Sequence, residues 1–175
     1  QEGHGLSVTT EPEEWTRIAK LGGAPRWRLD GPGRFLDPSG IDVDAALARV
    51  PDLVVPTTRW AVEVPMDEEG TLGEMQFDTR REAMEEADPE DGLLPYKVRS
   101  WAAGPGLAKL LRTHGYKRTS TETPVAFALM EYTHRFHPEL DGVWWDDDVW
   151  EWGAPRGGIH PARLKHWRWT QEGIC

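Results

Sequence analysis

The sequence predicts an α+β fold of mostly antiparallel strands with short helices between them, in a single domain over residues 1–175. Strand-like and helix-like segments alternate along the chain, and several strand segments are separated only by short turns. A hydrophobic content of 38% is enough for a core, and 175 residues is the size of one ordinary domain. The chain shows no internal repeat and no segment with the composition of an interdomain linker.

The first third of the chain predicts two strands and two helices. Residues 6–9 have the length and composition of a short strand, and Thr10 and Glu13 have the spacing of a capping box that opens a helix. Gly22 and Gly23 are expected to end that helix. A second strand, a Gly-Pro-Gly turn and a second helix are expected at 26–29, 31–33 and 43–50.

The middle of the chain predicts a hairpin followed by a capped helix. Residues 60–64 alternate in the manner of a half-buried strand, and residues 72–77 are expected to pair with them across an acidic turn. Thr79 and Glu82 form a second capping box, which opens a helix that ends near Asp88. A strand at 93–101 and a helix at 107–114 complete this part.

The last third predicts a helix from Thr123 and Pro124 to about Phe136, with proline at its first helical position. Glu131 lies on this otherwise apolar helix; we expect it to be exposed, and a buried functional acid is the alternative. A strand at 143–145, a Gly/Pro-rich loop at 153–158 and a closing element at 159–169 follow.

Charge and composition exclude several classes of protein. The net charge of -10 disfavours nonspecific binding to nucleic acid, because phosphates are repelled by most of the surface. No apolar run approaches the roughly 20 residues that span a bilayer, so no membrane association is expected. The first residues are polar and show no signal peptide. Cys175 is the one cysteine, so no internal disulfide forms, which agrees with a reducing, cytoplasmic location.

Ten tryptophans are many for this length, and six of them follow residue 140. They either fill a core that has few Ile and Phe residues or form an aromatic surface for a flat ligand or a partner protein. Both alternatives stay open for the last six, which are Trp144, Trp145, Trp150, Trp152, Trp167 and Trp169.

A run of three aspartates follows the strand predicted at 143–145, and Glu151 comes soon after it. In an extended chain Asp146 and Asp148 point to the same side and Asp147 points away. Carboxylates at a strand end can act as a base, bind a metal or accept hydrogen bonds from a ribose. The alternative is a solvated acidic turn.

Arg156 lies between Pro155 and two glycines, where small neighbours let a ligand approach the backbone closely. A guanidinium group in this place can bind a carboxylate or a phosphate through two parallel hydrogen bonds. The alternative is a loop arginine that pairs with the nearby aspartates.

We predict no metal site. His134 and His137 are three residues apart on a predicted helix and Asp141 follows, but there is no cysteine ligand and no His-Glu-x-x-His motif. The basic segment that contains His160, Arg163 and Arg168 is expected to be an edge element with buried tryptophans, and contact with a nucleic acid is the alternative.

Two parts of the chain resemble ADP-ribosyltransferase-like domains. Gly5-Leu6-Ser7-Val8-Thr9-Thr10, followed by a helix that opens Glu11-Pro12-Glu13-Glu14-Trp15, resembles their strand-then-helix unit. Asp141-Gly142-Val143-Trp144-Trp145-Asp146-Asp147 and Ala154-Pro155-Arg156-Gly157-Gly158-Ile159 resemble their last two strands. The resemblance covers about a third of the chain, and its motifs are short.

The resemblance implies a domain that binds NAD, as substrate, or a related nucleotide between the first strand and the last two. It further implies transfer of ADP-ribose to a protein or nucleic-acid acceptor, in a toxin, defence or phage setting. Ser7 and Thr9, with His4, are then expected to contact the nicotinamide or its ribose, and Arg156 the pyrophosphate. Trp144 or Trp150 is expected to stack on a flat ring. Stabilisation of the oxocarbenium-like charge is expected from one of three acidic residues: Asp146, Asp148 and Glu151.

The chain also departs from the family pattern. Only His4 is available in place of the early His or Arg, and Arg156 and Gly157 stand where a glutamate usually begins the final strand. A non-catalytic, acidic protein-binding module, such as an inhibitor or accessory protein with a Trp-rich C-terminal surface, is therefore the alternative. A metal-dependent nuclease or phosphatase ranks last, because consecutive aspartates do not converge well on one ion.

Overall fold

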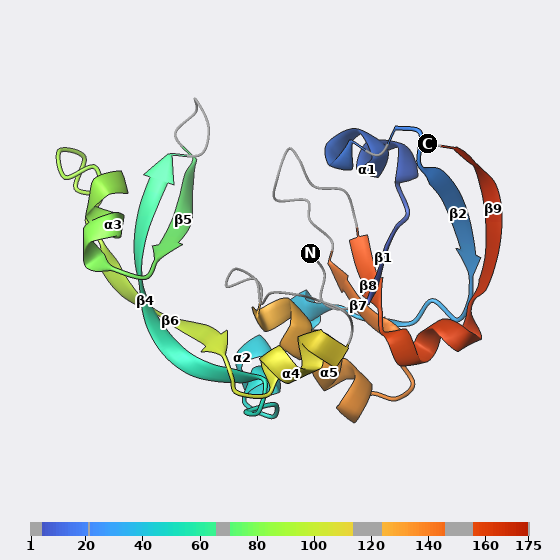
Figure 1. Ribbon diagram of the computed structural model, residues 1–175. Helices are drawn as coiled ribbons and strands as arrows, with labels where there is room; N and C mark the ends of the chain where they lie inside the picture. The colour runs from blue at the N-terminus through green and yellow to red at the C-terminus, as the bar shows by residue number, and fades with distance from the viewer. Residues whose placement is uncertain (1–4, 21, 66–70, 114–123, 146–155, 175) are drawn as a thin grey trace. The chain divides into compact units, whose positions relative to one another are not determined.

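The computed structural model describes residues 5–20, 22–65, 71–113, 124–145 and 156–174 (Figure 1). Its strands pair mostly antiparallel and its helices are short, so the predicted α+β class is confirmed. By its internal contacts the chain divides into two compact units, residues 1–54 with 103–175 and residues 55–102. The single domain over residues 1–175 stays a prediction.

A four-stranded sheet forms the centre of the first unit. Its strands, in spatial order, are β1 (Leu6–Thr9), β8 (Arg156–Ile159), β7 (Gly142–Trp145) and β3 (Phe35–Leu36). β1, β8 and β7 pair antiparallel, and β3 pairs parallel to β7. Segments from both ends of the chain therefore share one sheet, in which β1 is an edge strand.

Helix α5 (Pro124–Phe136) supplies much of the buried apolar surface of the first unit. It begins at Pro124 and ends at Phe136, as predicted, and Phe127, Leu129 and Met130 are among its buried residues. α5 contacts β7 and two short helices, α2 (Val43–Leu47) and α4 (Leu107–Thr113). A 3₁₀ turn, η1 (Pro38–Gly40), precedes α2. The core of this unit thus includes the contacts of α5 with its neighbouring helices and strand.

A two-stranded ribbon belongs to the same unit. β2 (Pro25–Asp30) pairs antiparallel with β9 (Arg168–Ile174), and a shift of register leaves Glu172 unpaired with any residue of β2. The 3₁₀ segment η2 (Pro161–His166) joins β8 to β9. The closing segment predicted at 159–169 is therefore the end of β8, a 3₁₀ turn and the start of β9.

Helix α1 (Pro12–Ala19) follows β1, but its predicted cap is wrong. Glu11, not Thr10, is the N-cap residue and makes no side-chain cap bond, because Pro12 with its fixed φ occupies the first helical position. Thr9 Oγ1 instead accepts a hydrogen bond from the backbone N–H of Glu11 at 3.1 Å. The Glu13 carboxylate, left out of any capping box, pairs with Arg26.

The second unit is a three-stranded sheet in the order β5 (Leu72–Phe77), β4 (Val54–Pro65), β6 (Tyr96–Ala103), with helix α3 (Arg80–Glu86) after β5. The predicted hairpin is confirmed by the antiparallel register of β4 and β5. The predicted capping box is also confirmed, because Thr79 Oγ1 accepts from Glu82 N–H at 3.2 Å and Glu82 accepts from Thr79 N–H at 3.0 Å.

Aromatic and basic side chains meet on the second unit. The Lys97 ammonium lies 5.4 Å from the centre of the Trp60 ring, and the Arg99 guanidinium lies 5.2 Å from that of Trp101. Trp60 and Trp101 thus each form a cation–π contact with a basic residue of the same unit.

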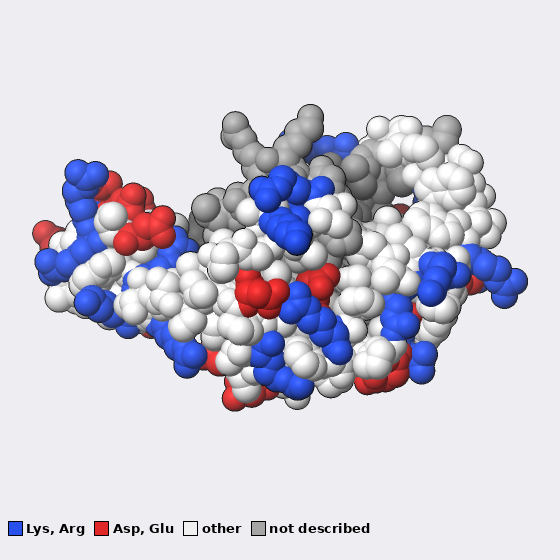
Figure 2. All heavy atoms as spheres, turned by 60° about the horizontal axis from the view of Figure 1, so that its bottom comes forward, with Lys and Arg blue, Asp and Glu red and all other residues white. Residues whose placement is uncertain are grey.

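Acidic and basic side chains are interspersed on the face of the molecule shown in Figure 2. Across the described ranges, no helix has both the length and the apolar character needed to cross a bilayer.

Candidate functional site

The residues of β1, β8 and β7 are aligned across the sheet. Val8, Gly157 and Trp144 lie opposite one another in one row, and Thr9 and Arg156 lie in the next row. Side chains alternate between the two faces along a strand, while directly opposed residues share a face. Trp144 therefore points to the opposite face of the sheet from Thr9 and Arg156.

Glycines make room for the Trp144 indole and for the close approach of the strands. A Cβ atom at Gly157 would overlap the six-membered ring of Trp144, and one at Gly142 would overlap the backbone carbonyl oxygen of Gly158. The glycines of the sequence around Arg156 thus serve the packing of β7 against β8. This packing leaves the indole face beside β8.

Three aromatic side chains form a cluster next to this sheet. The Phe35 ring centre lies 5.5 Å from that of Trp144 and 6.1 Å from that of Trp167, in tilted geometries. Gly31 leaves space for the Trp167 ring, which a Cβ there would overlap. The Trp167 Nε1–H group is buried and has no hydrogen-bond acceptor among the described residues.

Charged side chains face the cavity from α1 and the ribbon. Arg26 donates a hydrogen bond to Glu13 at 2.8 Å, and Arg28 lies 3.8 Å from Glu172 and 3.0 Å from Asp30. The hydrogen bond from Arg26 holds the pKa of the Glu13 carboxyl below its usual range. All of these ion pairs are solvent-exposed, with 77% of the Glu13 side chain accessible.

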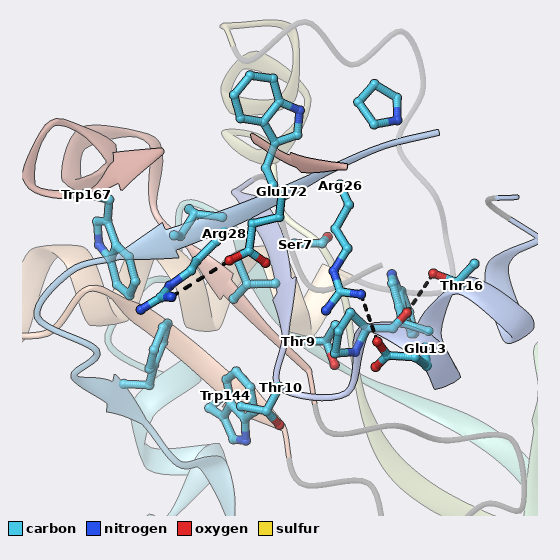
Figure 3. A pocket seen from close by; sticks show the side chains of 17 residues that line it. Ser7, Thr9, Thr10, Glu13, Thr16, Arg26, Arg28, Trp144, Trp167 and Glu172 are labelled. Atoms are coloured by element: carbon cyan, nitrogen blue, oxygen red, sulfur yellow. Dashed lines mark hydrogen bonds and ion pairs between the residues drawn. The ribbon is translucent and has the colours of Figure 1, made fainter. Parts of the chain in front are cut away.

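A cavity of about 670 Å³ lies among these elements (Figure 3). Its volume falls within the range of small-molecule sites, about 300–1,000 Å³. The lining combines hydroxyl groups, aromatic rings and two charge pairs. It consists of Ser7, Val8, Thr9, Thr10, Pro12, Glu13, Trp15, Thr16, Pro25, Arg26, Trp27, Arg28, Leu29, Phe35, Trp144, Trp167 and Glu172.

The structure brings three of the predicted site residues to one cavity. Ser7 and Thr9 line it from β1, and Trp144 lines it from β7. Val8 also lines the cavity, so residues from both faces of β1 border the same space. Arg156 does not line the cavity, although it lies directly opposite Thr9 in the sheet. Its predicted role stays a prediction.

The other predicted site residues lie outside the described part of the chain, and their roles stay predictions. They are His4, Asp146, Asp148, Trp150 and Glu151. The Gly/Pro-rich loop that was predicted at 153–158 falls partly in the same range.

Sequence reasoning missed the charged side of the cavity. Arg26 and Arg28 were placed on a strand but given no role, and Glu172 was not considered. A usable signal was present, since Arg26, Trp27, Arg28 and Leu29 alternate between charged and apolar residues, as a strand beside a polar space does. The partner strand β9 was not recognisable, because about 140 residues separate the paired positions, for example 138 between Asp30 and Arg168.

A second polar cluster is buried in the first unit. His160 Nε2 lies 2.9 Å from Glu131 Oε1, and the rings of His160 and His134 stack with centres 3.9 Å apart. The backbone N–H of Ala162 donates to His160 Nδ1, so Nε2 carries the hydrogen and donates to Glu131. Glu131 is only 7% exposed, so the expectation of an exposed position was wrong. The apolar helix around it is buried on nearly all sides.

This cluster does not have the form of a metal site. His134 stacks on His160, whereas His137 contacts Tyr132 and Glu139. The buried Asp141 carboxylate instead accepts a hydrogen bond from the Arg34 backbone at 3.0 Å. Within the described ranges, no group of three or more His, Cys, Asp or Glu residues is arranged to hold a metal ion.

Comparisons of the sequence with models of protein families and with curated proteins give no match, and comparison of the fold with solved structures gives none.

Proposed function

We propose that this chain is a divergent ADP-ribosyltransferase-like domain that binds NAD or a related nucleotide in the cavity bordered by β1, β7, α1 and the β2–β9 ribbon. The observation that carries the proposal is that Ser7 and Thr9 on β1 and Trp144 on β7 border one cavity of about 670 Å³. Trp144 is far from Ser7 and Thr9 in the sequence, and the resemblance to the family had assigned all three to a nucleotide site.

The lining supports a ligand with flat rings and sugar hydroxyls. Trp144, Phe35 and Trp167 offer ring faces for stacking, and the side chains of Ser7, Thr9 and Thr10 offer hydroxyl groups. A nucleotide has a flat base, ribose hydroxyls and phosphates. Each of these parts has a matching group in the lining.

For the chemical step, the proposal assigns the cleavage of the bond between nicotinamide and ribose to the C-terminal carboxylates. One of Asp146, Asp148 and Glu151 would stabilise the positive charge that develops on the ribose as the bond breaks. These residues are outside the described part of the chain, so the described residues support the binding half of the proposal.

A titration of NAD, ADP-ribose and nicotinamide tests the binding half. Ten tryptophans give a strong fluorescence signal, and four of them line the cavity: Trp15, Trp27, Trp144 and Trp167. We expect saturable quenching together with a thermal shift, since a ligand at 100 times its Kd adds about 2.7 kcal/mol of stability. The absence of both signals at millimolar nucleotide contradicts the proposal.

A protein-binding module is the second candidate, and two exposed tryptophans favour it. Trp27 is 48% and Trp169 is 44% exposed, and both lie on the β2–β9 ribbon. Exposed tryptophans are frequent hot spots of protein interfaces. Without a nucleotide response, a Trp27→Ala, Trp169→Ala double variant that loses capture of a defined partner would support this second function.

A further inference from the structure

The β2–β9 ribbon presents two guanidinium groups to the cavity. Arg26 and Arg28 are two residues apart on β2, so they point to the same side of the strand, about 7 Å apart along it. Both line the cavity, and Figure 3 shows them extending from the same side of β2. They are the only Lys or Arg residues among the described residues of the lining.

The present partners of these arginines are easy to replace. Arg26 pairs with Glu13, and Arg28 pairs with Asp30 and Glu172; the side chains of these five residues are 37% to 77% exposed. Exposed ion pairs contribute little to stability, since water screens them and holding two long side chains costs entropy. A ligand anion can therefore displace the carboxylates at small cost.

Phosphate groups are better partners for guanidinium than the present carboxylates. A diphosphate carries more negative charge than one carboxylate and accepts parallel hydrogen bonds from the planar guanidinium group. The shift of register at Glu172 places its carboxylate beside Arg28. Glu13 thus keeps the Arg26 guanidinium paired, and Asp30 and Glu172 keep that of Arg28 paired, until an anion replaces them.

Arg156 is the rival anion-binding group within the described sheet. It lies on β8 directly opposite Thr9 in the sheet. Unlike Thr9, it is absent from the cavity lining. A ligand stacked on Trp144 would therefore meet Arg26 and Arg28 rather than Arg156.

We infer that Arg26 and Arg28 bind the diphosphate of a nucleoside diphosphate whose base stacks on the Phe35, Trp144 and Trp167 rings, with Glu13 and Glu172 as the carboxylates that the diphosphate displaces. This inference rests on the proposed nucleotide site and names its anion-binding residues. It also gives the two carboxylates an effect on affinity opposite to that of the arginines.

Calorimetric titration with ADP and with adenosine tests the inference. The wild-type chain is expected to bind ADP at least about tenfold more tightly than adenosine, because only ADP engages the arginines. The Arg26→Ala, Arg28→Ala double variant is expected to lose that tenfold preference and to bind adenosine unchanged. Unchanged adenosine binding shows that the cavity is still folded. The Glu13→Gln, Glu172→Gln double variant is expected to bind ADP about two- to fivefold more tightly, since the competing carboxylates are gone.

Arg17→Ala is the matched control, because Arg17 forms an exposed ion pair with Glu14 on α1 but does not line the cavity. It is expected to leave ADP binding unchanged. A loss of ADP binding in Arg156→Ala, with the Arg26→Ala, Arg28→Ala variant unaffected, would overturn the inference and leave the nucleotide site standing. Failure of the wild-type chain to bind either ADP or adenosine would overturn the nucleotide site itself, and the inference with it.

Discussion

Two groups of acidic and basic side chains in the first unit differ in almost every physical respect. Glu131 and His160 are 7% and 5% exposed, and His160 Nε2 lies 2.9 Å from Glu131 Oε1. At the cavity, Glu13 and Arg26 are paired at a similar distance of 2.8 Å, but their side chains are 77% and 37% exposed. Although the distances are similar, the two pairs contribute very differently to the stability of the fold.

Burial determines which of these charged groups can exchange one partner for another. Groups buried without water depend on each other, because the loss of one leaves the other unsatisfied in a medium of low dielectric constant. Exposed groups regain water when they separate, so their pairing contributes little. Glu131 and His160 thus hold the fold, and the charges at the cavity can serve a ligand.

Removal of Glu131 should give the largest effect. Glu131→Ala leaves the His160 Nε2–H group without its acceptor. It also removes the ion pair between Glu131 Oε2 and Arg135 Nε, which are 3.5 Å apart. We expect a loss of about 3 kcal/mol in the free energy of unfolding, measured by urea denaturation. Glu131→Gln keeps an oxygen acceptor and should lose less.

The matched variant at the cavity is Glu13→Ala, for which we expect no measurable change in the free energy of unfolding, because water replaces the lost partner of Arg26. A comparison of the two alanine variants in the same denaturation series separates the two groups. Equal losses in both would show that the distinction between them is wrong.

A glycine of the sheet should give the next largest effect. A Cβ at Gly142 would overlap the backbone of Gly158, which cannot move without disturbing β8. Gly142→Ala is therefore expected to cost about 1–3 kcal/mol, seen as a lower midpoint in thermal unfolding. Gly40→Ala is the control, since a Cβ there meets no atom within 4 Å. Equal stability of the two variants would contradict the close approach of β7 and β8.

The pair of Asp52 and Arg135 should give a smaller effect than Gly142, together with a pH dependence. Hydrogen bonding to Arg135 holds the pKa of the Asp52 carboxyl below its usual range. Because the folded-state pKa is depressed, the stabilisation is present above the unfolded pKa of about 3.9 and is lost as pH falls through the folded value.

Asp52→Asn should therefore cost about 1 kcal/mol or less at pH 7, since half of the Asp52 side chain is exposed. Urea denaturation of both proteins between pH 7 and pH 2 should show the difference shrinking below about pH 4. A difference that stays constant over this range would exclude the assigned cause.

Local patterns of the sequence were sufficient for much of the fold. The alternation of residues 60–64, the capping box of Thr79 and Glu82, and the proline at position 124 each act within a few residues, and the structure has the predicted element at each. Thr10 was misjudged as a cap because Pro12 fixes the first helical position and makes Glu11 the N-cap residue.

Long-range pairing could not be predicted from such patterns. Glu131 is buried with His160 as its hydrogen-bond partner. His160 lies 29 residues further along the chain, so the helix sequence alone does not reveal this partner. Ser7, Thr9 and Trp144 were chosen through a family resemblance, and the fold brings them to one cavity. The proposed role of Arg26 and Arg28 in binding a diphosphate depends on the pairing of β2 with β9, which no local pattern predicts.

The most direct test of the nucleotide site is a nuclear magnetic resonance titration of the tryptophan indole N–H signals with ADP, with signals assigned by single Trp→Phe substitutions. Trp144 and Trp167 line the cavity of the first unit, whereas Trp60 and Trp101 lie in the second unit beside their own basic partners. We predict saturable shifts of the Trp144 and Trp167 signals, with those of Trp60 and Trp101 unchanged. Shifts confined to Trp60 and Trp101, or no shift at millimolar ADP, would contradict the assignment of this cavity as a nucleotide site.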